Sequence, residues 1–347
     1  STPYAPFMDY LAFGILPRHL LEGKSPQEII NDPYNLLPVG SGPYRVADLR
    51  SEDGQITAVV LESFEDYYMG EPLIEQVVLR FFDSSARALE AYQAGEILGI
   101  GSISPDTLDA VLAEPNLNIF SVRVPEMTMV LFNLGETTPV FFKDPVFRQA
   151  MLTALNRPWM IDQVMEGQAV LANSPILMGS WAYFSEVETF EYNPEDAVSQ
   201  LRSGGYGLPA EGLVREKDGE RLAFELIHTD DERHTMLAEM IRDYWAEVGV
   251  QVTLVAVPPD AVIRDYLQPR AYEAALVDLA LFDSPDPDPY PFWHQAMIDT
   301  GQNYSQWDDR RASEYLERAR VTPNHEERTR LYRNFQIHFA RQLPALP

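Results

Sequence analysis

The sequence predicts a mixed α/β protein, because segments with the period of strands alternate with segments with the period of amphipathic helices. The clearest case is a helix expected from about 235 to 248, which lies directly between two expected strands, 222–228 and 250–257. A chain of 347 residues is long enough for two domains or one large one. Its 46% hydrophobic and 23% charged residues are typical of globular proteins and exclude disorder as a description of the whole chain.

Proline marks the expected starts of several helices, since proline at the first helical position removes no hydrogen bond. Four side chains able to cap a helix stand directly before a proline: Ser25, Ser104, Asp144 and Asn193. Asn324, followed three residues later by Glu327, indicates a fifth helix start. The apolar face of that fifth helix is expected to be buried and carries Leu331, Tyr332, Phe335 and Phe339.

Further strands and helices are expected on both sides of these segments. Strand patterns occur at 44–46, 56–62, 76–82, 117–122, 127–133 and 274–282, and helix patterns at 86–94 and 105–112. The strand expected at 274–282 runs without a gap into residues 283–289 (DSPDPDP), which we call the acidic segment. Such charged, proline-rich connections are commonly solvated turns, but loops at strand ends also commonly deliver functional groups. Asp283 is therefore a candidate ligand-binding residue.

The charge balance excludes two classes of partner. The chain has 26 basic and 53 acidic side chains, a formal net charge of −27, which repels nucleic acid backbones and anionic membrane surfaces. It contains no run of 18 apolar residues, so no segment is expected to span a bilayer. It contains no cysteine, which excludes disulfides, thiolate catalysis and cysteine-ligated metals. These features leave the cellular compartment open.

The common catalytic and cofactor motifs are absent. Neither Ser41, Ser102 nor Ser203 has glycine two residues away on both sides, as a nucleophile elbow requires. The glycines match neither a dinucleotide fingerprint nor a phosphate loop, and no HExxH motif occurs. The acidic segment has three closely spaced aspartates, at 283, 286 and 288, but prolines replace the glycine turn of a calcium loop. We therefore expect no catalytic residues, no metal site and no cofactor.

A series of short blocks occurs in one order along nearly the whole chain: 40–46 (GSGPYRV), 67–72 (YYMGEP), 94–96 (AGE), 144–150 (DPVFRQA), 154–157 (ALNR), 192–197 (YNPEDA) and 303–307 (NYSQW). Together these blocks resemble the extracellular solute-binding proteins of family 5, the peptide and nickel receptors of ABC importers. Most of the blocks are expected to be scaffold, and Arg148, Asn193 and Tyr332 are interpreted as turn, cap and core residues.

The resemblance implies a two-lobed, periplasmic-binding-protein-like α/β fold with mixed sheets (class II, cluster C), present in part. Residues 1–125 would form the C-terminal part of lobe I, and residues 126–347 the second, hinge-connected ligand-binding lobe. The chain is thus expected to be a fragment that lacks the N-terminal part of lobe I and the C-terminal return to it.

The resemblance also implies a function. The protein would be the substrate-binding component of an ABC importer, would capture a short peptide between two lobes without chemistry, and would deliver it to the permease subunits. Asp283 aligns with the family aspartate that pairs with the ligand's ammonium group, and the peptide would lie along 277–283 as an added strand. Tyr304 is a second, weaker candidate, while Ala280 stands where the family has tryptophan. A monomer outside the cytoplasm, periplasmic or lipid-anchored, is expected.

Two alternatives remain open from the sequence. A receptor of the same fold could bind a nickel chelate, haem or an oligosaccharide, because a fold does not determine its ligand. An acidic carbohydrate-active hydrolase is a second alternative, since 53 acidic residues provide many chance carboxylate pairs and 11% of the residues are aromatic. The number of regular strand and helix alternations is too small for a (β/α)₈ barrel, which counts against the hydrolase.

Overall fold

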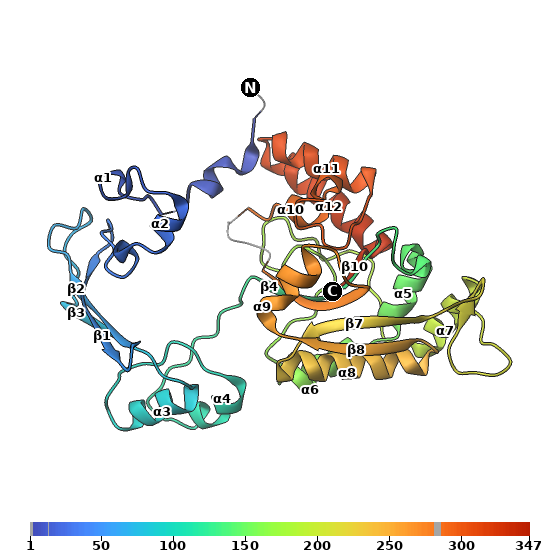
Figure 1. Cartoon of the computed structure of the whole chain (residues 1–347), viewed down its shortest axis with the longest axis horizontal. Coiled ribbons are helices and arrows are strands. Elements are labelled where there is room, and N and C mark those ends of the chain that lie inside the picture. Colours follow the sequence, from blue (N-terminus) through green and yellow to red (C-terminus); the bar gives the residue numbers. More distant parts are fainter. Residues whose placement is uncertain (1–2, 13, 281–285) are drawn as a thin grey trace. The chain divides into compact units, whose positions relative to one another are not determined.

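The computed structural model of the chain describes residues 3–12, 14–280 and 286–347 (Figure 1). The chain forms two compact units: unit 1 consists of Ser1–Ala12 and Val122–Pro347, and unit 2 of Phe13–Ser121. The assignment of 1–125 and 126–347 to two lobes stays a prediction. In the described part of the chain, no helix is both long enough and apolar enough to cross a membrane.

Unit 1 is built on a five-stranded mixed sheet with the order β10-β4-β9-β7-β8. Its strands are β4 (Glu126–Phe132), β7 (Ala223–Thr229), β8 (Gln251–Val257), β9 (Ala274–Ala280) and β10 (Ala345–Leu346). Strand β7 is parallel to β8 and β9, whereas β4 is antiparallel to β9 and β10. The mixed α/β prediction is therefore confirmed, and the β7–α8–β8 unit is the strand, helix, strand unit expected at 222–257.

The helices of unit 1 include one long crossover helix and a C-terminal pair. Helix α8 (Glu232–Glu247) connects β7 to β8 and lies along these strands in Figure 1. Helices α11 (Arg310–Val321) and α12 (His325–Gln342) pack against each other. The other helical elements are η1 (Ala5–Ala12), η3 (Val140–Lys143), α5 (Pro145–Thr153), α6 (Arg157–Met165), α7 (Pro194–Ser203), α9 (Pro259–Ala261), η4 (Val262–Leu267), α10 (Tyr290–Trp293) and η5 (Gln295–Met297). A short hairpin pairs β5 (Glu216–Lys217) with β6 (Glu220–Arg221).

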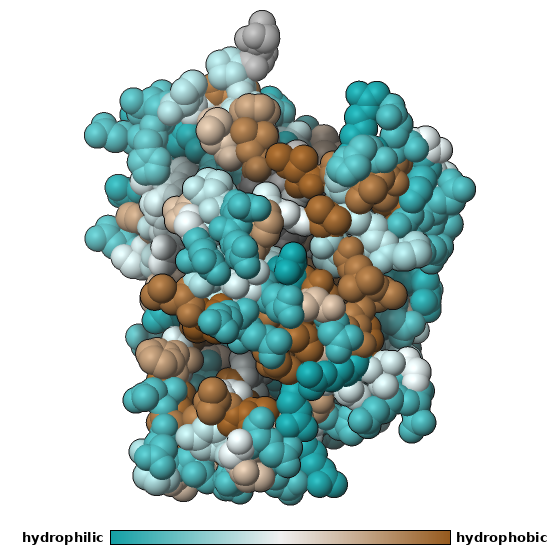
Figure 2. Space-filling model, turned by 90° about the vertical axis from the view of Figure 1, so that its left-hand side faces the viewer, coloured by the Kyte–Doolittle hydropathy of each residue, from teal (hydrophilic) through white to brown (hydrophobic). Residues whose placement is uncertain are grey.

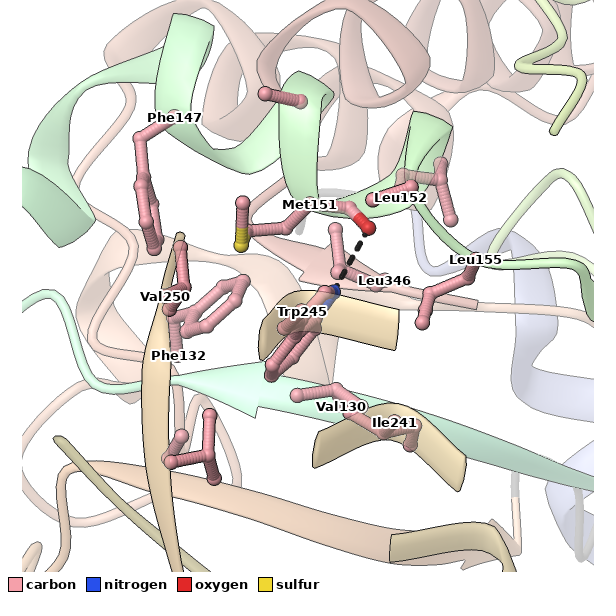
Figure 3. Packing of buried hydrophobic residues seen from close by; sticks show 14 of the residues in the cluster. Val130, Phe132, Phe147, Met151, Leu152, Leu155, Ile241, Trp245, Val250 and Leu346 are labelled. Atoms are coloured by element: carbon pink, nitrogen blue, oxygen red, sulfur yellow. Dashed lines mark hydrogen bonds between the residues drawn. The ribbon is translucent and has the colours of Figure 1, made fainter. Parts of the chain in front are cut away.

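Two hydrophobic cores form because successive residues of a strand point to opposite faces of the sheet. Leu276 of β9 belongs to the core that contains α5 and α8, whereas its neighbour Val277 belongs to the core that contains α11 and α12. In the first core the indole Nε1 of Trp245 donates a hydrogen bond to the carbonyl oxygen of Met151 at 2.9 Å (Figure 3). The sheet therefore has helices packed on both faces.

The helix caps expected from the sequence are largely observed. The side chains of Asp144, Asn193 and Asn324 accept hydrogen bonds from the first turns of α5, α7 and α12. Ser25 forms a capping box with Glu28 at α2. At α4 (Pro105–Leu112) the helix begins at the expected proline, but the side chain of Ser104 makes no cap hydrogen bond.

Arg148 joins helix α5 to the end of helix α12. Its buried guanidinium donates to the carbonyl oxygens of Gln342 and Leu343, at the C-terminal end of α12. A cation there satisfies free carbonyls and interacts favourably with the helix dipole. Burial lowers the pKa of Arg148 to about 10, so the side chain stays charged at neutral pH. The interpretation of Arg148 as a turn residue is therefore wrong, because it lies inside α5 and its contacts hold the end of α12. Asn193 caps α7 and Tyr332 is fully buried, as expected of a cap and a core residue.

Unit 2 contains a three-stranded antiparallel sheet with the order β1-β2-β3: β1 (Tyr44–Glu52), β2 (Gln55–Ser63) and β3 (Gln76–Arg80). Its helices are α1 (Arg18–Leu21), α2 (Pro26–Ile30), η2 (Pro33–Asn35), α3 (Ser85–Gln93) and α4. Many of its apolar side chains are exposed, including Ile15, Leu73 and Leu98. Figure 2 shows such apolar areas in brown between hydrophilic side chains in teal.

One predicted strand of unit 2 is wrong. Residues 117–122 adopt no regular secondary structure, and Phe120 and Val122 are largely exposed. An alternating pattern forms a strand only where a neighbouring strand pairs with it through backbone hydrogen bonds. Neither the three-stranded sheet nor the five-stranded sheet includes this segment.

Candidate functional site

The candidate site lies at the carboxyl end of β9. This strand has the sequence AALVDLA, and its residues are mostly buried up to Leu279. In sheets with parallel strands, ligands commonly bind beyond the carboxyl ends of the strands. The residues that follow, 281–285, lie outside the described part of the structure, and they include Asp283. The role of Asp283 therefore stays a prediction from the sequence.

The edge of β9 is open along part of its length. Strand β9 pairs with β4 from Ala274 to Ala280, but it pairs with β7 only from Ala274 to Leu276. Among the described residues, 277–280 thus have a strand partner on one side only. Backbone N–H and C=O groups on an open edge can pair with an extended peptide.

A charged cluster stands beside this open edge and centres on Asp278 of β9. The Oγ1 atom of Thr128, in β4, donates a hydrogen bond to Asp278 Oδ1 at 2.6 Å. Arg233, in the first turn of α8, forms an ion pair with Asp278 Oδ2. The side chain of Arg233 is one third exposed, so part of it is accessible to solvent.

His234 joins the same cluster from α8. Its side chain is buried, and its Nδ1 atom lies 2.7 Å from Oδ2 of Asp231, the N-cap residue of the helix. Its Nε2 atom lies 3.3 Å from Asp278 Oδ2, which is ion-pair distance without the alignment of a hydrogen bond. The Oγ1 atom of Thr229, at the end of β7, donates a further hydrogen bond to Asp231 at 2.5 Å.

The electrostatics of the cluster favour charged side chains. Burial alone would lower the pKa of His234, but the contact with Asp278 and the charges of Asp278 and Asp231 outweigh it and raise the pKa. Burial would raise the pKa of Asp278, but His234, Thr128 and Arg233 hold it well below the usual range. These opposite shifts favour the protonated imidazole and the ionised carboxylates over their neutral forms.

Glu126 is the exception in this cluster. It is the residue of β4 opposite Ala280, and it lies on the same face of the sheet as Asp278. Burial, followed by the negative charge of Asp278, raises the pKa of Glu126. The ionised form of Glu126 is therefore disfavoured beside Asp278.

The second half of the acidic segment is buried, so the solvated-turn interpretation is wrong for its last two aspartates. Asp286 forms an ion pair with Arg328 of α12 at 2.6 Å, and Asp288 forms one with Arg320 of α11 at 2.7 Å. These pairs fix residues 286–289 to the α11–α12 pair. In the described residues no group of three or more potential metal ligands is present.

Tyr304 contacts Arg270 and Tyr272, two residues that directly precede β9 in the chain. Its ring lies 4.9 Å from the guanidinium of Arg270, and its carbonyl oxygen accepts a hydrogen bond from the Tyr272 hydroxyl at 2.6 Å. The side chain is buried in the hydrophobic core, and this burial raises the pKa of Tyr304. A seven-residue strand spans roughly 20 Å, so the structure places Tyr304 towards the opposite end of β9 from Ala280. A role for Tyr304 in ligand binding stays a prediction.

Sequence reasoning missed the charged cluster. Asp278 is a charge inside an otherwise apolar strand, which is an unusual position and was a usable signal. Arg233 and His234 follow directly after a helix cap at the end of a parallel strand, where functional groups commonly lie. Their contact with a strand more than forty residues further along the chain has no local sequence signal.

Comparison with known proteins identifies relatives over the whole chain. Residues 1–302 match the model of the bacterial extracellular solute-binding proteins, family 5 Middle. The oligopeptide-binding protein AppA of Bacillus subtilis (strain 168) is 25% identical over 335 residues, which cover 95% of this chain and 60% of AppA. The dipeptide-binding protein of Escherichia coli (strain K12) is 24% identical over 358 residues, which cover 100% of this chain and 62% of that protein. The chain therefore spans less than two thirds of the length of these relatives.

Solved structures show the same fold. B. subtilis AppA in complex with a nonapeptide has a TM-score of 0.73 at 24% identity. The match covers 95% of this chain and 65% of AppA. HbpA2 from Haemophilus parasuis has a TM-score of 0.80 at 22% identity, over 99% of this chain and 66% of HbpA2. NikZ from Campylobacter jejuni in complex with Ni(L-His) has a TM-score of 0.75 at 26% identity, over 99% of this chain and 67% of NikZ. The predicted family resemblance and fold class are confirmed.

Proposed function

The chain belongs to the bacterial extracellular solute-binding proteins of family 5, and from this premise we propose that it is the substrate-binding part of an ABC importer that captures short peptides. The family consists of receptors rather than enzymes, so the ligand is held and released without a chemical step. Relatives named as oligopeptide- and dipeptide-binding proteins support a peptide as the ligand class.

The observation that carries the proposal is the half-open edge of β9. Residues 277–280 pair with β4 on one side and have no described strand partner on the other. An extended peptide added there would gain backbone hydrogen bonds, which provide affinity without selecting side chains. This arrangement suits a receptor that accepts peptides of varied sequence.

The carboxyl groups near this edge suit the positively charged end of a peptide. In the proposed complex Asp283 pairs with the ammonium group, and a charge-assisted hydrogen bond of this kind contributes about 1.5–3 kcal/mol. A positive charge near the end of β9 would also favour the ionised form of Glu126, which Asp278 disfavours. Tyr304 remains a weaker proposed contact.

The remaining parts of the proposal concern the whole protein. Two lobes would close around the peptide by hinge rotation, since the bound peptide favours the closed state. The protein would act as a monomer, in the periplasm or lipid-anchored at the cell surface, and would deliver its ligand to the permease subunits of the importer. No nucleic acid partner is proposed, because the net charge is −27.

A nickel chelate or haem is the second candidate ligand, because NikZ with Ni(L-His) and the haem-binding protein A of Haemophilus influenzae are relatives. The described residues contain no cluster of three or more potential metal ligands, so they offer a metal ion no ready set of side chains. The carbohydrate-active hydrolase receives no support from the family.

Identification of co-purified ligand tests the proposal. The protein is purified without denaturant, the bound material is released with acid, and it is examined by mass spectrometry and metal analysis. We expect a mixture of short peptides. Release of haem, of a nickel chelate or of sugars in stoichiometric amount, without peptides, would overturn the peptide assignment.

A further inference from the structure

His234 is buried between two carboxylates that belong to different elements. Asp231 ends the connection from β7 and caps α8, whereas Asp278 belongs to β9. The two ring nitrogens of His234 face one carboxylate each, at 2.7 Å for Asp231 and 3.3 Å for Asp278. The imidazole therefore bridges the helix start and the strand beside the candidate site.

The chemistry of imidazole makes this bridge dependent on a proton. Neutral imidazole carries one N–H, so one of its nitrogens presents a lone pair. With Asp231 at one nitrogen and Asp278 at the other, any neutral tautomer sets a lone pair against a carboxylate. Only the doubly protonated ring attracts both aspartates.

The contact between His234 and Asp278 also affects the other residues that Asp278 binds. Asp278 also binds Arg233 and Thr128, so its position fixes the Arg233 side chain relative to the end of β9. We propose that His234 is a positioning residue whose second proton joins Asp231 to Asp278 and so holds Arg233 and the open edge of β9 in the arrangement that receives the ligand. This inference rests on the proposed function for its effect on binding, but not for the proton bridge itself.

The direction of the pH dependence follows from the charged groups around the ring. The start of α8 contributes its N-cap residue Asp231 and the cation Arg233, β9 contributes Asp278, and β4 contributes Glu126. The three carboxylates favour the protonated ring and Arg233 opposes it, with a net rise in the pKa of His234. The bridge is therefore intact at weakly acidic pH and is lost as the pH rises through the raised pKa of His234.

The test compares wild type with His234→Gln by calorimetric titration of trialanine across the pH range. The α-amino group of the peptide titrates near pH 8, but equally for both proteins, so the ratio of their dissociation constants isolates His234. We expect His234→Gln to bind about fivefold more weakly at about pH 6 and within about twofold of wild type at about pH 9. A ratio that does not change with pH would overturn the proposal.

His338 offers a matched control. Its Nε2 atom lies 2.9 Å from Oδ2 of Asp309, which caps α11 as Asp231 caps α8. His338→Gln should leave the pH dependence of peptide binding as in wild type. The same change in both variants would show a general effect of losing a histidine and would contradict a specific role for His234.

A second measurement separates this inference from the proposed function. NMR titration of the imidazole in ligand-free wild type should give His234 a midpoint above that of an ordinary histidine, and Asp278→Asn should shift this midpoint to lower pH. This result needs no ligand and no folded His234 variant. If wild type binds no peptide at any pH, the proposed function fails, whereas the NMR midpoint still decides the bridge. A midpoint unchanged by Asp278→Asn would overturn the bridge even if peptides bind.

Discussion

Arg328 of α12 and Asp286 of the acidic segment form an ion pair with 2.6 Å between Nη2 and Oδ2, and both side chains are nearly fully buried. The Nε atom of Arg328 also donates a hydrogen bond to the carbonyl oxygen of Ala319, at the end of α11. One arginine thus joins α11, α12 and the segment that follows β9. The segment after the candidate site is fixed to the helical layer by charge as well as by packing.

Replacement of Arg328 by methionine should destabilise the protein, because it leaves a buried carboxylate without its cation. Removal of one partner of a buried ion pair costs about 3–5 kcal/mol in the free energy of unfolding. Chemical denaturation monitored by tryptophan fluorescence measures this change. The double variant Arg328→Met with Asp286→Leu should recover much of the loss, since it removes both charges.

Arg310 provides the control for this prediction, because its contacts with Glu314 and Glu317 lie at the surface. Arg310→Met should leave the unfolding midpoint nearly unchanged. If Arg328→Met were as mild as Arg310→Met, the acidic segment would not depend on the buried pair.

Trp245 to phenylalanine should also destabilise unit 1, by about 2–4 kcal/mol. The smaller ring leaves a cavity in the core and leaves the carbonyl of Met151 without its hydrogen bond (Figure 3). Denaturant unfolding followed by circular dichroism measures the loss. Trp159→Phe is the matched control, since Trp159 is half-exposed, and a similar loss in both variants would contradict a specific role for the core hydrogen bond.

Glu126 to glutamine should stabilise the protein at neutral pH but not near pH 4. Burial and the charge of Asp278 raise the pKa of Glu126, so the folded state holds this proton more tightly than the unfolded state. Stability therefore falls as the pH rises from the unfolded pKa of about 4.3 through the raised folded pKa. Glutamine cannot ionise, so the variant does not lose this stability as the pH rises.

Solvent screening keeps the expected gain small, about 0.3 kcal/mol, because Glu126 is largely exposed. Urea unfolding of wild type and variant at about pH 4 and about pH 7.5 measures it. Glu211→Gln, at an exposed position, is the control. A gain that is equal at both pH values, or a loss at neutral pH, would show that the charge of Asp278 does not act on Glu126.

The positions of helices and strands could be predicted from the sequence better than the segments against which they pair or pack. The expected helix at 235–248 is α8, but it begins at Glu232 because Asp231 caps it, and its first turn carries no apolar signal. The failed strand at 117–122 has the right local alternation but no neighbouring strand. Local periodicity reports which face of a segment can be buried, whereas strand pairing depends on distant segments.

The site shows the same division between local and distant information. The end of β9 and the acidic segment were found because an apolar strand runs directly into charged residues. The partners of those charges were not found, because Arg233 lies 45 residues before Asp278 and Arg328 lies 42 residues after Asp286. In the structure Asp286 and Asp288 form buried ion pairs with the helical layer, whereas the role of Asp283 stays a prediction from the sequence.

Asp283 to asparagine should weaken peptide binding by about tenfold or more, since loss of a charge-assisted hydrogen bond of about 1.5–3 kcal/mol corresponds to at least one decade in affinity. Calorimetric titration of trialanine into both proteins measures the change. Asparagine keeps the size of the side chain, so the loss isolates the charge. The control is Asp265→Asn, because Asp265 is exposed on η4 and forms an ion pair with Arg264. N-acetylated trialanine, which lacks the ammonium group, should bind wild type and Asp283→Asn equally weakly. A variant that binds unmodified trialanine as tightly as wild type would remove Asp283 from the site and leave the open edge of β9 as the remaining argument for peptide binding.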